Sequence, residues 1–154
     1  MSVTPSFWLW RETYFFNFLY YRCRQLSHPE ISDYFGWLKN AYRGEIWVRQ
    51  RERLDFLRAE CQDQGIKLRV AVFPFLQNLG ANYPFREAHA ALDEYWRERG
   101  VPAIDLLPVI EAHAGEGMMV HRFEAHPSRR AHALAAEAIW NGLVRDLAEE
   151  LRSP

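Results

Sequence analysis

The chain is poor in lysine and has a nearly balanced charge. Only two of its 154 residues are lysine, its arginines alternate with acidic residues, and its formal net charge is −1. Such a balance exerts little attraction on a nucleic acid or an anionic lipid surface. We therefore expect neither as a partner.

The sequence also has few cysteines and no long uncharged apolar run. Cys23 and Cys61 form no Cys-x-x-Cys pair, which predicts free thiols of a reduced compartment, although a disulfide stays open. The apolar stretch 7–21 is interrupted by charged residues, and it is shorter than the roughly 20 residues that a membrane span needs. No basic residue precedes it, so we expect a buried helix, no membrane span and no signal peptide, which favours the cytoplasm for the chain as written.

What the chain does contain is enough apolar surface for one domain over residues 1–154, with 49% hydrophobic residues. The hydrophobic pattern predicts four helices, over residues 6–26, 45–64, 85–99 and 127–151. It also predicts a short helical turn at residues 34–39. Strands are expected at 66–73 and 101–105, each after a glycine that ends a helix. This alternation is typical of an α/β fold with parallel strands, but two strands leave the sheet without outer neighbours.

The clearest chemical signal is the sequence FEAHPS at residues 123–128. Proline favours the first position of a helix, so Pro127 places His126 at or beside the N-cap. There the helix dipole disfavours an imidazolium, and a neutral imidazole is what a general base needs. Glu124 can fix the tautomer of the ring if the segment is extended. The alternative is an ordinary loop histidine beside a solvated acid.

Residues 124–139, with an acid, a His-Pro pair and an alanine-rich helix, resemble the last sequence block of the SGNH/GDSL hydrolases. Residues 72–74, 82–85 and 100–108 also resemble the second half of that family, so the likeness covers roughly residues 45–150. The resemblance implies a partial flavodoxin-like α/β/α three-layer fold, with few parallel strands and long helices. It also implies ester hydrolysis by a Ser-His-Asp triad, with the oxyanion held by backbone, glycine and asparagine donors.

By this resemblance His126 is the general base and Glu124 is the acid, where the family usually has aspartate. Ser128 stands where the family usually has asparagine. The Gly-Asp-Ser block that supplies the nucleophile and the Gly-x-Asn-Asp block of the oxyanion hole are both missing from the chain. We therefore expect a small-molecule ester as substrate, no cofactor, and a nucleophile from other sequence. A second chain carrying the missing half, or a second copy of this one, is an expected partner.

Other interpretations stay open. Four histidines, at positions 113, 121, 126 and 132, lie close in sequence, but no His-Glu-x-x-His motif or cysteine ligand set accompanies them, so no metal is expected. Asp105, at the end of a predicted strand, serves either a site or a structural cap, of which we favour the cap. The chain as a whole is alternatively an inactive remnant that binds a partner, or an unrelated helical interaction module.

Overall fold

The computed structural model describes residues 8, 12–28, 32–121, 124–145 and 147. These residues form a mixed α/β structure that is mostly helical, with short strands in two small sheets. The chain divides into two compact units, residues 1–46 and 47–154, and each is described by itself. The single domain over 1–154 stays a prediction. None of the described helices combines the length and the apolar character that crossing a membrane requires.

The first unit contains α2 (Tyr14–Ser27) and α4 (Tyr34–Ala41). Asp33 caps α4, because its side chain accepts a hydrogen bond from the backbone N–H of Gly36 at 3.0 Å. The buried helix expected over residues 6–26 is wrong for its described part, since α2 has no buried residue. Two described helices are too few to enclose aromatic side chains that point to every side of α2, and the first residues of the predicted helix lie mostly outside the described ranges.

The second unit carries both sheets. Its elements are α5 (Gly44–Asp63), which begins just before it, β1 (Val70–Val72), α6 (Arg86–Glu98), β2 (Ala103–Asp105), α7 (Leu107–Glu111), the 3-10 turn η1 (Ala114–Glu116), β3 (Met119–His121), β4 (Glu124–Pro127), α8 (Arg129–Ile139) and the π-helical turn η2 (Trp140–Val144). The predicted second and third helices and both predicted strands are confirmed, with shorter strands. Gly65 and Gly100 follow α5 and α6 with φ of 68° and 63°, so the expected glycine stops are confirmed as well.

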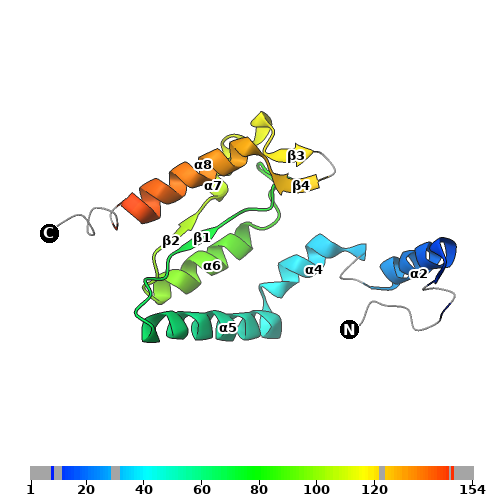
Figure 1. Cartoon of the computed structure of the whole chain (residues 1–154), viewed down its shortest axis with the longest axis horizontal. Helices are drawn as coiled ribbons and strands as arrows, with labels where there is room; N and C mark the ends of the chain where they lie inside the picture. Colours follow the sequence, from blue (N-terminus) through cyan, green and yellow to red (C-terminus); the bar gives the residue numbers. More distant parts are fainter. Residues whose placement is uncertain (1–7, 9–11, 29–31, 122–123, 146, 148–154) are drawn as a thin grey trace. The chain divides into compact units, whose positions relative to one another are not determined.

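Strands β1 and β2 are parallel, as the alternation predicted, with Val70 opposite Ala103 and Val72 opposite Asp105. Within this unit, the pair lies between α8 and its π-helical extension on one side and α6 on the other, with α5 beyond α6 (Figure 1). Gly142 allows the close approach of η2, because a Cβ there would lie 2.9 Å from Cδ1 of Ile104. Strand β2 therefore contacts a helical segment on each side, while β1 stays half-buried to exposed.

The core of the second unit forms where α7 packs on α8. Leu106 and Ile110 are fully buried, and they meet Ala131, Leu134 and Ala135 of α8. Alanines at two of these helix positions keep the packing close. The buried stripe predicted for the last helix is confirmed at Leu134 and Ala135.

A charged bridge joins α5 to α6. Asp55 accepts hydrogen bonds from the guanidinium of Arg99 and from the hydroxyl of Tyr95, and the guanidinium also lies 3.7 Å from the centre of the Tyr95 ring. The hydrogen bond from Arg99 holds the pKa of Asp55 at about 2. Burial, together with the bond to Asp55, raises the pKa of Tyr95 to about 12.

Replacing Asp55 with asparagine is expected to lower the free energy of unfolding by about 1 kcal/mol at pH 7. The pKa shift alone corresponds to more, but the Asp55 side chain is 39% exposed and solvent screens the pair. Since the folded pKa lies below the unfolded value of 3.8, this stabilisation is complete above the unfolded pKa and is lost as the pH falls through about 2. Urea unfolding at pH 7 and near pH 2.5 measures both effects.

The matched control is Asp93→Asn. Asp93 also pairs with an arginine, Arg97, but both side chains are mostly exposed. Its loss is expected to cost less than about 0.5 kcal/mol. Equal losses in the two variants, or a larger difference between Asp55→Asn and the wild type in acid than at pH 7, would contradict the bridge described here.

Candidate functional site

The predicted base and acid lie on one strand. Strand β4 pairs antiparallel with β3, and alternate residues of a strand point to the same face, so Glu124 and His126 lie side by side. Nδ1 of His126 is 2.8 Å from Oε1 of Glu124. The histidine side chain is 78% exposed, and no hydrogen bond from its Nε2 to another described residue is found. The pair thus presents one ring nitrogen close to a carboxylate oxygen and the other accessible.

The start of α8 differs from the prediction. The N-cap is Ser128, whose hydroxyl oxygen accepts a hydrogen bond from the N–H of Ala131 at 3.3 Å, and the helix begins at Arg129. Pro127 belongs to β4, because it is the register partner of Met119. His126 therefore lies two residues before the N-cap, where the helix dipole acts on it less strongly than predicted. The polar contact recorded for the ring is with the carboxylate of Glu124.

The described part of the second unit brings no nucleophilic serine to His126. The second unit contains two serines. Ser153 lies outside the described residues, and the hydroxyl of Ser128 caps α8. The N–H of Ser128 also donates to the carbonyl of Met118 at 2.8 Å, which joins the end of β4 to the residue before β3. Ser128 thus has a structural role in this hairpin.

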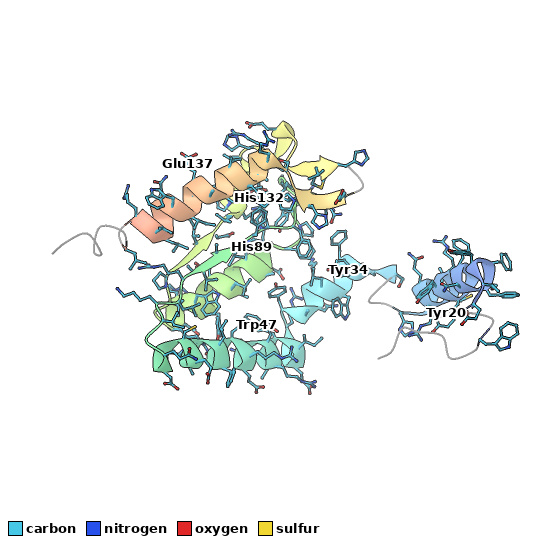
Figure 2. All side chains as sticks on the ribbon, in the orientation of Figure 1. Tyr20, Tyr34, Trp47, His89, His132 and Glu137 are labelled. Carbon is cyan, nitrogen blue, oxygen red and sulfur yellow. The ribbon has the colours of Figure 1, made fainter. Side chains whose placement is uncertain are left out.

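A second histidine cluster is buried at the carboxyl ends of β1 and β2. His89 of α6 is 7% exposed, and its Nδ1 is 2.7 Å from Oδ1 of Asp105, the last residue of β2 (Figure 2). Its Nε2 is 3.2 Å from the hydroxyl of Tyr83, which accepts a hydrogen bond from the N–H of Phe75 at 2.9 Å. The carboxylate of Asp105 can only accept, so Nδ1–H of His89 is the donor in that contact, and the Tyr83 hydroxyl can then donate to Nε2.

This cluster joins the loops that follow the two parallel strands. Asp105 also accepts from the N–H of Leu107 at 2.9 Å, so the structural cap favoured for it is confirmed. The prediction did not include His89. A signal was present, because His89 lies seven residues before Trp96 on the buried side of a helix. Its polar atoms are all engaged, so the cluster is a structural connection.

The remaining described histidines of the second unit are placed differently. His113 and Arg130 both contact the carboxylate of Glu116, and these hydrogen bonds hold the pKa of Glu116 below its usual value. His132 is exposed on α8 (Figure 2), and His121 is the register partner of Glu124. Among the residues that the structure describes, no group of three or more histidine, cysteine or acidic side chains is arranged to hold a metal ion.

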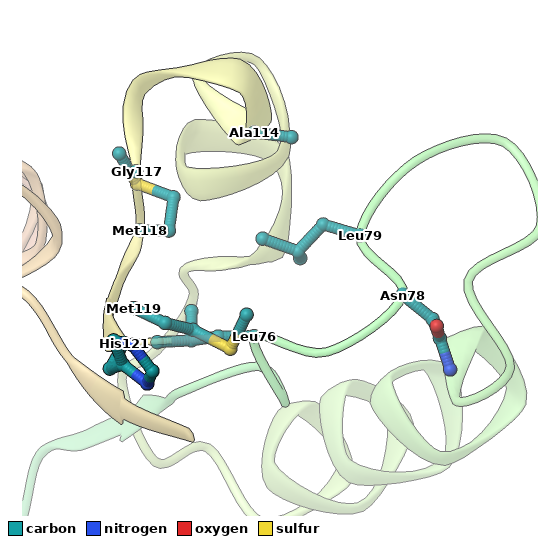
Figure 3. A pocket seen from close by; sticks show the side chains of 8 residues that line it. All are labelled: Leu76, Asn78, Leu79, Ala114, Gly117, Met118, Met119 and His121. Carbon is teal, nitrogen blue, oxygen red and sulfur yellow. The ribbon is translucent and has the colours of Figure 1, made fainter. Parts of the chain in front are cut away.

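A pocket of about 360 Å³ lies next to the hairpin formed by β3 and β4. It is bounded by the loop after β1, by η1 and the residues after it, and by β3 (Figure 3). The side chains around it are mostly apolar: Leu76, Asn78, Leu79, Ala114, Gly117, Met118, Met119 and His121. The hairpin therefore carries the acid–base pair on one strand and part of a pocket on the other.

Comparisons with protein-family models, with curated proteins and with solved structures give no significant match to this chain. The likeness to the SGNH/GDSL hydrolases accordingly depends on the residues quoted from the sequence. Any functional conclusion has to be drawn from the geometry of the second unit.

Proposed function

We propose that this chain is the acid–base half of an SGNH-like ester hydrolase, with His126 as general base and Glu124 as the acid that orients it. The observation that carries the proposal is the 2.8 Å contact between Nδ1 of His126 and Oε1 of Glu124 beside an exposed ring. A partial flavodoxin-like α/β/α architecture is part of the proposal. It is supported by a parallel strand pair whose second strand, β2, contacts α6 and η2.

The chemistry follows from the tautomer that the carboxylate selects. When Nδ1–H donates to Glu124, the lone pair of the neutral ring is on Nε2. Nε2 then takes the proton from an attacking hydroxyl as its oxygen bonds to the ester carbonyl carbon. Glu124 stabilises the resulting imidazolium, which returns the proton to the departing alcohol. Glutamate performs this role in place of aspartate because its longer side chain reaches the ring from two residues away.

The attacking hydroxyl is the missing part of the site. We propose that a serine from other sequence supplies it, in a second chain or in a missing half. With an activated ester such as p-nitrophenyl acetate, a water molecule can replace that serine. Its oxygen attacks the carbonyl carbon, Nε2 accepts its proton, and p-nitrophenolate leaves without needing a proton.

The test uses the full chain and p-nitrophenyl acetate. Hydrolysis per protein molecule is expected to be faster than with an equal concentration of free imidazole, because the base is already oriented. A fluorophosphonate probe is expected to leave the chain unlabelled, since it reacts with activated serines. Turnover no faster than that of imidazole contradicts the proposed hydrolase, and labelling contradicts the missing nucleophile.

A second candidate function, a partner-binding half-domain, is favoured by the open side of β1. Among the described residues, β1 pairs only with β2. The N–H of Val70 and the carbonyl of Val72 bond toward β2, so the backbone groups of Ala71 face the other edge. Such an edge pairs readily with another strand.

Sedimentation equilibrium tests this candidate with a second copy of the chain as partner. If β1 edges pair between copies, Ala71→Pro is expected to abolish association, since it removes the outward N–H. Ala71→Val keeps that N–H and is expected to leave association intact. A wild-type chain that is monomeric at high concentration contradicts pairing between copies.

A further inference from the structure

We infer that the pocket beside the β3–β4 hairpin binds the acyl chain of the ester, and that the substrate carries a short straight-chain acyl group. This inference rests on the proposed function and adds the class of substrate to it. A methylene group is close in size to a water molecule, whose share of liquid volume is about 30 Å³. A pocket of about 360 Å³ therefore has room for a short acyl chain.

The walls of the pocket are apolar and belong to the core. Leu76 and Met118 are buried members of the core cluster, and Leu79 and Met119 pack against it. Leu79 extends from its loop toward Met118, with Met119 and Leu76 below (Figure 3). Unbranched methionine side chains adapt to the shape of a flexible alkyl chain. These walls therefore suit an aliphatic ligand better than a charged or sugar-like one.

The loop that closes the pocket is held in place before any ligand binds. The N–H of Gly80 donates to the carboxylate of Glu111 at 3.1 Å, and Arg86 bonds both to that carboxylate and to the carbonyl of Gly80. In the same loop Asn78 has a φ of 59°, a left-handed turn conformation that asparagine adopts more readily than most residues other than glycine.

The pocket and the acid–base pair lie on neighbouring strands. His121, which lines the pocket, is the register partner of Glu124, and Met119 is the partner of Pro127, the residue after His126. Paired strands lie about 4.8 Å apart. An acyl tail in the pocket therefore lies beside β3, one strand spacing from the backbone of β4 that carries His126.

The methionines provide a site-specific measurement. The chain contains three, Met1, Met118 and Met119, and the last two line the pocket. With the methionine methyl groups labelled with ¹³C, hexanoate is expected to shift the signals of Met118 and Met119 and leave that of Met1 unchanged. From butyrate to hexanoate the affinity is expected to rise about fourfold for each methylene, and then to level off beyond octanoate.

Two variants separate the pocket from the chemistry. Leu79→Trp is expected to fill the pocket and abolish the shifts, whereas Leu57→Trp, on the exposed surface of α5, is the control that keeps them. His126→Gln is expected to keep hexanoate binding while ester hydrolysis is lost. Wild-type methionine signals that do not respond, or an affinity independent of chain length, overturn the acyl pocket. Chain-length-dependent binding without any hydrolysis supports the pocket and contradicts the proposed hydrolase instead.

Discussion

Replacing His126 with glutamine is expected to lower kcat for p-nitrophenyl acetate hydrolysis by at least about 100-fold. General-base catalysis contributes roughly 10² to 10⁴ in rate, and glutamine cannot accept a proton at the position of Nε2. Because His126 is 78% exposed, its replacement disturbs little packing, and the unfolding midpoint should be unchanged. KM should also change little, since the ring stabilises the transition state and not the bound substrate. Steady-state kinetics with p-nitrophenyl acetate and p-nitrophenyl hexanoate, together with urea unfolding, provide the measurements.

Three further variants define the role of Glu124 and the specificity of the effect. Glu124→Gln removes the charge that stabilises the imidazolium and is expected to lower kcat about tenfold or more. Glu124→Asp should have a kcat between those of Glu124→Gln and the wild type if the shorter side chain still reaches the ring. His132→Gln replaces another exposed histidine of the same unit and should leave kcat within twofold. If His126→Gln and His132→Gln have the same kinetic effect, the base has been assigned to the wrong residue.

Replacing His89 with alanine is expected to lower the free energy of unfolding by about 3 kcal/mol. The substitution leaves a cavity and removes one hydrogen-bond partner from the Tyr83 hydroxyl and one from the Asp105 carboxylate. Native domains are stable by only about 5–15 kcal/mol, so this is a large fraction of the total. Urea unfolding followed by tryptophan fluorescence measures the loss.

Tyr83→Phe tests the same connection without a cavity. It keeps the ring but removes the oxygen that accepts the N–H of Phe75, and the expected loss is about 2 kcal/mol. Hydrogen exchange at the Phe75 amide should accelerate, which a change elsewhere in the core would not produce. The control is His113→Ala, whose contact with Glu116 is partly exposed and should cost less than about 0.5 kcal/mol. A loss for His89→Ala no greater than for this control would refute the connection.

Local pattern predicted the regular elements of the second unit well. Glycines after α5 and α6 adopt the left-handed conformation that ends helices, and the strands that follow are parallel as the alternation of elements required. The spacing of Glu124 and His126 also led directly to a contact, since two residues along an extended segment return a side chain to the same face. These features depend on neighbours within a few residues, which a pattern can capture.

The hairpin and the start of α8 could not be obtained in this way. Met118 to Val120 is too short and too apolar to reveal whether it pairs, and Pro127 is compatible both with a strand end and with a first helical turn. Because Pro127 pairs with Met119, it is the last residue of β4, and the N-cap of α8 is Ser128. The position of His126 relative to the helix therefore depended on a contact made by another strand.

The sequence by itself determined the alternation of α5, β1, α6 and β2 and the side-by-side placement of Glu124 and His126, because both follow from backbone geometry over short distances. Only the tertiary structure decided what surrounds them: the pocket formed by three separate segments, and the buried link from His89 to Asp105 and Tyr83. Side chains of this kind meet because the parallel strands end at one edge and the core packs the intervening loops together.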